Sequence, residues 1–196
     1  MAFVKKDTIG GFNQFLKDQK AAGKNASLTL VQFDTGGIDT VHENVAIDSV
    51  PELTDRSYVP RGGTPLLDAL GQTIERTGAN LKAIPEAERP DKVVFVIITD
   101  GQENASRTFN KSQVGEMVMH QTDVYKWLFV YLGANQDAFS EARQIGIAAA
   151  HAANYATANM ASAFAATSSN LSAYRRTGLP RAMGYSNEQR ERLNRQ

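Results

Sequence analysis

The sequence predicts an α/β fold, a three-layer sandwich whose mostly parallel sheet carries one antiparallel edge strand. Three observations support this prediction. Residues 93–98 and 127–133 are short apolar runs rich in β-branched and aromatic residues, as in strands that are buried on both faces of a sheet. Segments with the apolar spacing of helices lie between and after these runs. A hairpin pattern at residues 27–47 adds the antiparallel strand, and the whole alternation is typical of helices packed on both faces of a sheet.

A helix, a hairpin and a second helix are predicted in the first half of the chain. Asp7 can cap the first helix. SLTLVQF at 27–33 has a partly alternating strand pattern, DTGG supplies a turn, and IDTVHENVAI at 38–47 returns antiparallel as an edge strand. Thr64 in the cap position and Pro65 at the first turn predict the start of the second helix.

The second half of the chain continues with strands and helices in alternation. Ser112 begins a predicted helix, and the apolar strand at 127–133 follows it. Asp137 caps a short amphipathic helix, residues 154–155 suggest a short edge strand, and residues 160–176 form the last predicted helix. These elements complete a folded domain that we place at residues 1–178.

Residues 179–196 are expected to be a solvated, poorly ordered tail, because they contain several arginines and few apolar residues. Nucleic-acid binding by this basic tail is less favoured, since no aromatic residues are interleaved for base stacking. Over the whole chain, 21 basic residues balance 21 acidic ones, so no overall field attracts nucleic acid or an anionic membrane. The chain has no cysteine and no apolar run long enough to span a bilayer, and we expect a cytoplasmic protein.

Two oxygen-bearing side chains are candidates for a functional site. Asp100 follows the strand at 93–98, where open α/β sheets place their ligands, and Gly101 lets the chain turn there. An ordinary turn capped by Asp100 is an equally good interpretation of this stretch alone. The hydroxyl of Thr64, at a helix start, could join the carboxylate of Asp100 in binding a hard cation such as Mg²⁺, although two ligands alone do not make a site.

Several enzyme classes lack their motifs in this sequence. It contains no G-x-x-x-x-G-K-[ST] loop, no G-x-G-x-x-G after a strand and no G-x-S-x-G elbow. A Mg²⁺-dependent hydrolase or phosphotransfer enzyme using Asp100 stays as the least favoured alternative, because no nucleophile, base or second carboxylate motif can be placed beside it. Asp68 and Glu103 are near in sequence, but we expect them on a helix surface and in a loop.

Together these segments resemble the von Willebrand factor type A (vWA) domain, and most of all its compact bacterial and phage-type members. The resemblance runs from about Asp7 to Gly178 and rests on DTIGGFNQFL, SLTLVQFD, YVPRGGTPLLDAL, VVFVIITDGQEN and FVYLGANQDA. It implies a Rossmann-like fold with a metal-ion-dependent adhesion site at the carboxyl ends of the strands, in which Thr64 and Asp100 match two ligand positions. The implied activity is protein binding, not catalysis: Mg²⁺ or Mn²⁺ is shared with an acidic side chain of a protein partner.

The sequence departs from the family at its start, where neither the first strand nor its D-x-S-x-S ligand motif occurs. In the family that strand lies between the strands matching residues 27–33 and 93–98. We therefore expect that these two strands close the gap, that another chain fills it, or that the reading frame upstream of Met1 encodes the strand. With only Thr64 and Asp100 left from the ligand set, cation binding is expected to be weak or absent, and a metal-independent scaffold is the alternative function.

Overall fold

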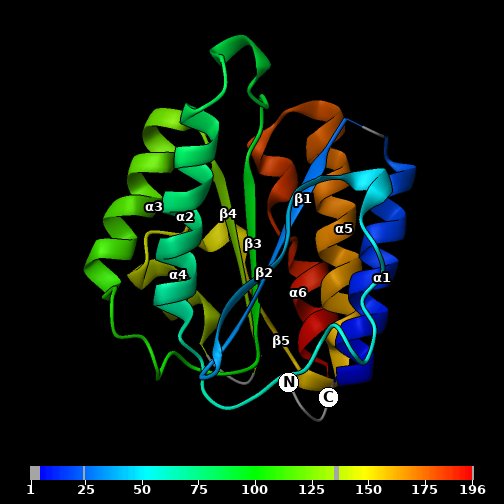
Figure 1. The fold of residues 1–196 in the computed structure, drawn as a ribbon. Helices are drawn as coiled ribbons and strands as arrows, with labels where there is room; N and C mark the ends of the chain where they lie inside the picture. The colour runs from blue at the N-terminus through cyan, green and yellow to red at the C-terminus, as the bar shows by residue number, and fades with distance from the viewer. Residues whose placement is uncertain (1–4, 24, 135–136, 196) are drawn as a thin grey trace.

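Two layers of helices enclose the strands in the computed structural model, which describes residues 5–23, 25–134 and 137–195 (Figure 1). The strands are β1 (Ser27–Asp34), β2 (Gly37–Ala46), β3 (Val94–Thr99), β4 (Leu128–Ala134) and β5 (Ala152–Tyr155). The helices are α1 (Lys5–Ala21), α2 (Leu66–Lys82), α3 (Lys111–Tyr125), α4 (Ala138–Gln144), α5 (Met160–Thr177) and α6 (Asn187–Asn194). Helices α2, α3 and α4 lie on one side of the strands and α1 and α5 on the other, which confirms the α/β sandwich.

The strands form two sheets rather than one. β1 and β2 make an antiparallel hairpin in which Ser27 lies opposite Ala46, so the predicted antiparallel edge is present. The second sheet is parallel, in the order β3-β4-β5, with Val94 opposite Leu128 and Tyr131 opposite Ala152. β1 and β3 are not hydrogen-bonded neighbours. Within the part of the chain that the structure describes, the two strands expected to flank a missing strand therefore do not pair with each other.

Helices α3, α4 and α6 begin where a nearby side chain accepts a hydrogen bond from one of their first amide groups. α3 begins at Lys111, one residue ahead of the predicted start at Ser112, and Asn110 and Gln113 form a reciprocal capping box there. At α4, the side chain of Asp137 accepts from the amide of Ser140, as predicted. The N-cap of α2 is Pro65, so Thr64 lies one residue further ahead than predicted. This small shift leaves the Thr64 side chain outside the helix.

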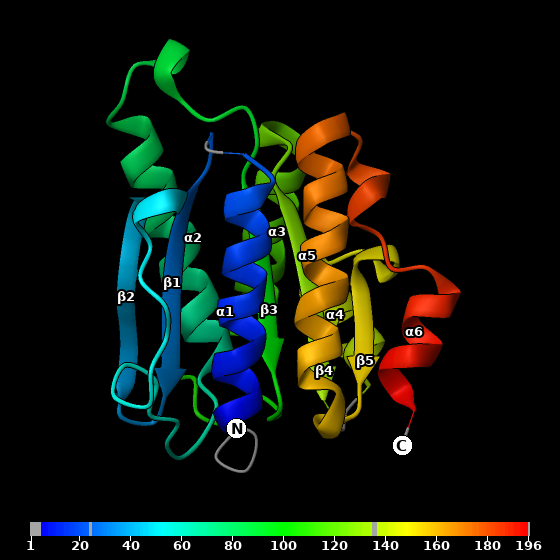
Figure 2. The ribbon, with the colours of Figure 1, turned by 90° about the vertical axis from the view of Figure 1, so that its right-hand side faces the viewer.

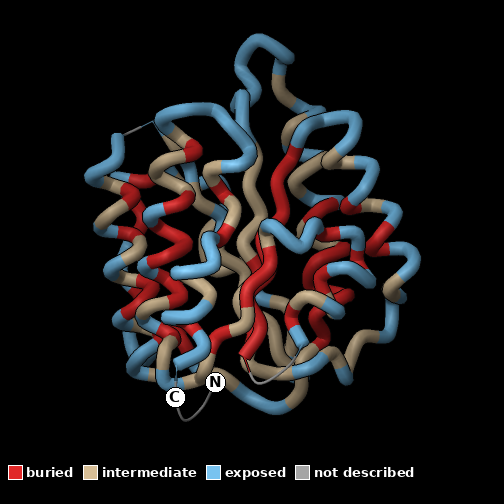
Figure 3. Tube along the Cα trace, turned by 180° about the vertical axis from the view of Figure 1, so that it is seen from behind, coloured by how far each residue is buried: buried red, intermediate tan, exposed pale blue. Residues whose placement is uncertain are grey.

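A separate hydrophobic core fills each side of the parallel sheet. The core toward α1 and α5 contains Leu16, Val130 and Leu132, whereas the core toward α2 and α3 contains Ile74 and Val114. Figure 3 shows the buried residues in the middle of the molecule and on the inner faces of the helices. All of β4 is buried, because it has a strand on both sides and helices above and below.

The carboxyl-terminal residues correct the expectation of a poorly ordered tail. A 3-10 turn at Pro180–Met183 is followed by α6, whose N-terminus has a capping box of Ser186 and Gln189. Met183, Tyr185 and Leu193 of this segment are buried, and Leu193 is 0% exposed, whereas Leu179 is 45% exposed. Figure 2 shows α6 beside β5, at the outer edge of the parallel sheet. This segment has few apolar residues, and it is ordered because Met183, Tyr185 and Leu193 pack into the core on the side of α1 and α5.

None of the helices in the described part of the chain combines the length and the apolar character that crossing a membrane requires.

Candidate functional site

The carboxyl ends of β1 and β3 lie at the same end of the molecule, where both arrows point in Figure 2. Three loops meet there, and we call their surface the crest: residues 34–37 between β1 and β2, residues 60–65 ahead of α2, and residues 99–105 after β3. The crest is where open α/β sheets bind their ligands. It includes both side chains that the sequence singled out, Thr64 and Asp100.

The structure brings Thr64 onto the turn that contains Asp100. A Cβ atom at Gly101 would collide with the Thr64 hydroxyl oxygen, so that hydroxyl lies against the backbone of the residue after Asp100. A larger residue at position 101 would force this hydroxyl to move. The two loops are also joined by a reciprocal pair of hydrogen bonds: the amide of Thr64 donates to Oδ1 of Asn104 at 2.8 Å, and the amide of Asn104 donates to the carbonyl of Thr64 at 3.2 Å. Thr64 and Asp100 are both partly exposed.

The turn after β3 is held from below by buried groups. The Thr99 hydroxyl donates to the carbonyl of Gly101 at 2.9 Å and accepts from the amide of Gly101 at 3.2 Å. The Tyr155 hydroxyl donates to the carbonyl of Thr99 at 3.2 Å. Thr99 and Tyr155 are 4% and 1% exposed. Because both anchors are buried, they hold the backbone on either side of Asp100 in place.

Glu103 connects this turn to the start of α2. Its Oε2 accepts from the amide of Leu67 at 2.9 Å and from the Ser106 hydroxyl at 2.7 Å, and its Oε1 accepts from the amides of Ala105 and Ser106 at 2.9 and 2.8 Å. Burial alone would raise the pKa of Glu103, but these hydrogen bonds together hold its pKa below the ordinary value. The Glu103 carboxylate therefore holds the loop after β3 in position against the start of α2. Its loop location was predicted, but its contacts with α2 were not.

Asp68, in α2, also connects this helix to the loop after β3. It is buried, which corrects the expectation that it lies on the helix surface. It is 7% exposed, and its carboxylate accepts from three successive backbone amides: Arg107 at 2.8 Å, Thr108 at 2.9 Å and Phe109 at 2.8 Å. Burial alone would raise its pKa, but these three bonds hold the pKa of Asp68 below its ordinary value. The sequence shows a carboxylate in the first turn of a predicted helix, but it does not show which loop that carboxylate contacts.

A third carboxylate at the crest, Asp34, is held in an ion pair. Oδ2 of Asp34 lies 2.9 Å from Nε of Arg61, and Oδ1 accepts from the amide of Gly36 at 2.6 Å. Arg61 also lies 3.6 Å from the carboxylate of Asp39. The pair links the hairpin turn to the loop ahead of α2. Sequence reasoning did not find it, since nothing in either loop alone indicates the other as its neighbour.

The donors at the crest fit a hard cation only in part. The Thr64 hydroxyl and the Asp100 carboxylate are oxygen ligands of the kind that Mg²⁺ prefers, and Mg²⁺ commonly keeps several waters beside one or two carboxylates. However, the described residues contain no group of three acidic, histidine or cysteine side chains that could hold a metal ion. Thr64 and Asp100 together offer two oxygen ligands, which is fewer than a cation site requires.

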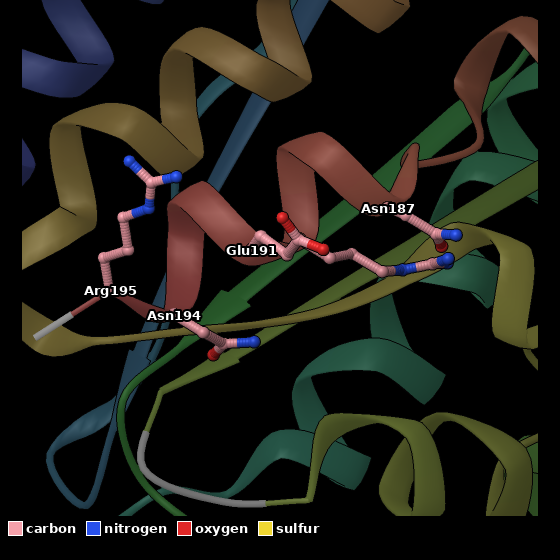
Figure 4. Close-up of a pocket in the computed structure, with 5 residues that line it drawn as sticks. Asn187, Glu191, Asn194 and Arg195 are labelled. Carbon is pink, nitrogen blue, oxygen red and sulfur yellow. The ribbon is translucent and has the colours of Figure 1, made fainter.

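Two surface hollows lie away from the crest. One follows α6 and is lined by Asn187, Arg190, Glu191, Asn194 and Arg195 (Figure 4). The other follows α4 and is lined by Asp137, Phe139, Ser140, Arg143, Ile147, Ala148 and Ala149. Both are open to solvent, and neither includes Thr64 or Asp100. In the first, Arg190 is already engaged, since its guanidinium donates to the carbonyl of Ala149 at 2.8 Å. We therefore keep the crest as the candidate site.

The fold and crest define an α/β sandwich with a polar site at the carboxyl ends of its strands. No family model and no curated protein matches the sequence. Among solved structures, the chain is similar to proximal thread matrix protein 1 (PTMP1) from the mussel byssus, with a TM-score of 0.57 and 16% sequence identity. The match covers 83% of this chain and 42% of that protein, so this chain spans less than half of its length. At this identity the likeness concerns the fold alone.

Proposed function

We propose that this chain is a protein-interaction module of the vWA type that binds its partner at the crest. In this proposal Thr64 and Asp100 share a divalent cation, Mg²⁺ or Mn²⁺, with an acidic side chain of the partner. The observation that supports it is the position of the Thr64 hydroxyl, directly against the turn that contains Asp100. Helix α2 and strand β3 separate Thr64 from Asp100 in the sequence, and the close approach of Thr64 to the turn after β3 supports the proposal.

A site with only two protein ligands favours reversible cation binding over a permanently bound metal ion. One hydroxyl and one carboxylate leave most of the coordination sphere of Mg²⁺ to water, so the affinity for cation alone is expected to be low. A carboxylate from the partner would add negative charge and a further ligand. The cation and the partner would therefore each strengthen the binding of the other. The absence of cysteine fits the cytoplasmic setting that we propose for this module.

We assign the crest to binding rather than to catalysis. None of the three histidines, His42, His120 and His151, is in a crest loop, and the chain has no cysteine. The carboxylates of Glu103 and Asp34 that flank the site accept hydrogen bonds from backbone amides or pair with Arg61. The crest therefore lacks the usual pairing of a nucleophile with a general base.

A metal-independent interaction module is the second candidate, and the lack of a three-ligand cluster among the described residues favours it. In that case the partner would contact the exposed side chains of the same crest and its surroundings. Val59, just ahead of the crest loop at 60–65, is 51% exposed, and Arg61 is also exposed. An exposed apolar side chain and an exposed basic side chain in the same segment suit an interface without a cation.

The test uses Mn²⁺, which broadens the NMR signals of nearby amides. We expect broadening at Thr64 and Gly101 in the wild-type chain, and its loss in Asp100→Ala. Asp91→Ala, which removes an exposed carboxylate at the other end of β3, is the matched control and should keep the broadening. Urea unfolding in EDTA should give similar stability for both variants, because Asp100 is not among the packed side chains of β3.

Three results would count against this proposal in different ways. Broadening that survives in Asp100→Ala would place the cation elsewhere. No broadening at any Mn²⁺ concentration would favour the metal-independent module. Severe destabilisation of Asp100→Ala in EDTA would show that the carboxylate is a structural cap, and the assignment of Asp100 to a cation site would fall.

A further inference from the structure

Among the residues that the structure describes, two strand edges in the interior layer have no strand beside them. β1 pairs with β2 on one side only, and β3 pairs with β4 on one side only. In each strand, about half of the backbone amides and carbonyls point toward the second edge, as in any strand. Figure 2 shows that β2 is the outermost strand of the hairpin, so the unpaired edge of β1 is the one toward β3.

The edges of β1 and β3 belong to the same layer of the sandwich. On one face, Leu28 and Leu30 of β1 and Val96 of β3 pack against the core cluster that includes Leu16 of α1. On the other face, Phe33 of β1 and Phe95 of β3 pack against the cluster of α2 and α3. The same helices therefore cover both strands, and both strands run toward the crest.

β3 is less buried than its neighbour β4, as expected for a strand with an open edge. β3 consists of apolar residues up to Thr99, yet Val94, Phe95, Val96 and Ile98 are only partly buried. β4, which has strands on both sides, is buried at every position. A parallel strand with helices on both faces is normally buried throughout, so β3 is short of one neighbour.

We propose that β1 and β3 together receive an extended strand from a partner protein, which pairs with both edges and joins the two sheets into one. The strand would run parallel to β1 and β3, toward the crest. It would need about six to eight residues to match them. Since helices lie over both faces, its side chains would be apolar and β-branched on both faces. Backbone hydrogen bonds would supply affinity, as in other cases of strand addition.

This interaction does not depend on the proposed cation site. It uses the backbone edges of β1 and β3, whereas the crest proposal uses the side chains of Thr64 and Asp100. The experiment is therefore done in EDTA, and Asp100→Ala should take up the strand as well as the wild-type chain does. Failure of one proposal leaves the other standing.

The probe is a blocked synthetic peptide of about ten residues, with valine and isoleucine at the central positions and lysines at both ends. Its control has prolines at alternate central positions and so lacks the N–H donors that pairing requires. Residue-resolved hydrogen exchange of the full chain is measured with each peptide. We expect the first peptide to slow exchange roughly tenfold or more at amides of both β1 and β3. The proline peptide should change nothing.

Three outcomes would overturn the proposal. In the chain alone, the unpaired-edge amides of β1 and β3 could exchange as slowly as those of β4, which would show that the edges are already covered. The first peptide could leave β1 and β3 unchanged even at saturating concentration. It could also slow exchange at β2 alone, which would mean that it adds to the outer edge of the hairpin.

Discussion

At the scale of single residues, the crest is organised by carboxylates that are not themselves candidate ligands. Asp68 and Glu103 accept hydrogen bonds from the backbone amides of residues 105–109 and of Leu67. These bonds fix the loop after β3 against the first turn of α2, which also supports the position of Thr64. The geometry of the candidate site thus depends on side chains that no binding motif would identify.

Asp68→Asn should destabilise the fold by about 1–3 kcal/mol, because an amide NH₂ group would face at least one backbone N–H that now has an acceptor. The two chains should be compared by urea unfolding at neutral pH. Asp91→Asn, at an exposed position, is the matched control and should stay within about 0.5 kcal/mol of the wild type. A loss no larger than that of the control would show that the loop has other sufficient anchors.

Acid should weaken the fold through the same carboxylates. The pKa values of Asp68 and Glu103 are lowered in the folded chain, so their stabilisation is complete at neutral pH and is lost as pH falls through the folded pKa values. We expect the decline below about pH 4. Burial also lowers the pKa of His151, which adds a loss of the same sign at higher pH.

Comparison with Asp68→Asn separates these contributions. The variant retains His151 and Glu103, so its unfolding free energy should fall less steeply than that of the wild type in the acid range alone. Urea unfolding over a series of pH values measures both slopes. Parallel curves for the two chains would mean that Asp68 does not titrate differently in the folded and unfolded states.

The sequence singles out Thr64 and Asp100 as candidates, but it does not show the contacts that surround them. Asp100 was found because it follows an apolar run, and Thr64 because it precedes a helix, and both patterns are local. The bonds of Asp68 to residues 107–109 span 39 to 41 positions, and the pair of Arg61 and Asp34 spans 27. Local patterns carry no information on such pairings, which are set by how the loops meet.

At the scale of elements, the strands were the most predictable part and the carboxyl-terminal helix the least. β3 and β4 are short, continuous apolar runs. A run of this kind and length indicates a strand that is covered on both faces. In α6, Leu193 is the only apolar side chain, so no periodic stripe could be recognised. Its order comes from tertiary contacts: Leu193 is fully buried, and its carbonyl accepts from the amide of Ala156 at 2.8 Å.

Leu193→Ala should therefore cost about 2–5 kcal/mol, as for other fully buried leucines. Leu179→Ala is the matched control in the same segment, because Leu179 is 45% exposed and should cost no more than about 0.5 kcal/mol. Thermal or urea unfolding measures both. Equal and small effects would restore the original expectation of a solvated tail after residue 178.

At the scale of the whole molecule, helix packing rather than strand pairing connects the hairpin to the parallel sheet. α1, which leads into β1, docks along α5 through a buried polar contact. The side-chain amide of Gln19, 2% exposed, donates to the carbonyl and hydroxyl of Ser168 at 3.0 and 2.9 Å. Arg175 donates to the carbonyls of Gln19 and Gly23 at 2.8 and 2.6 Å. Without a shared ladder, these contacts and the two cores hold the halves together.

The hairpin should consequently open more readily than the parallel sheet. No residue of β1 or β2 is fully buried, whereas every residue of β4 is, and unfolding the hairpin breaks no hydrogen bond of the β3-β4-β5 ladder. We expect amides paired between β1 and β2 to exchange with an opening free energy at least about 2 kcal/mol below that of β4. Native-state hydrogen exchange at low, increasing urea concentrations measures both values. A single opening free energy shared by β1 and β4 would instead show that helix packing alone makes the domain one cooperative unit.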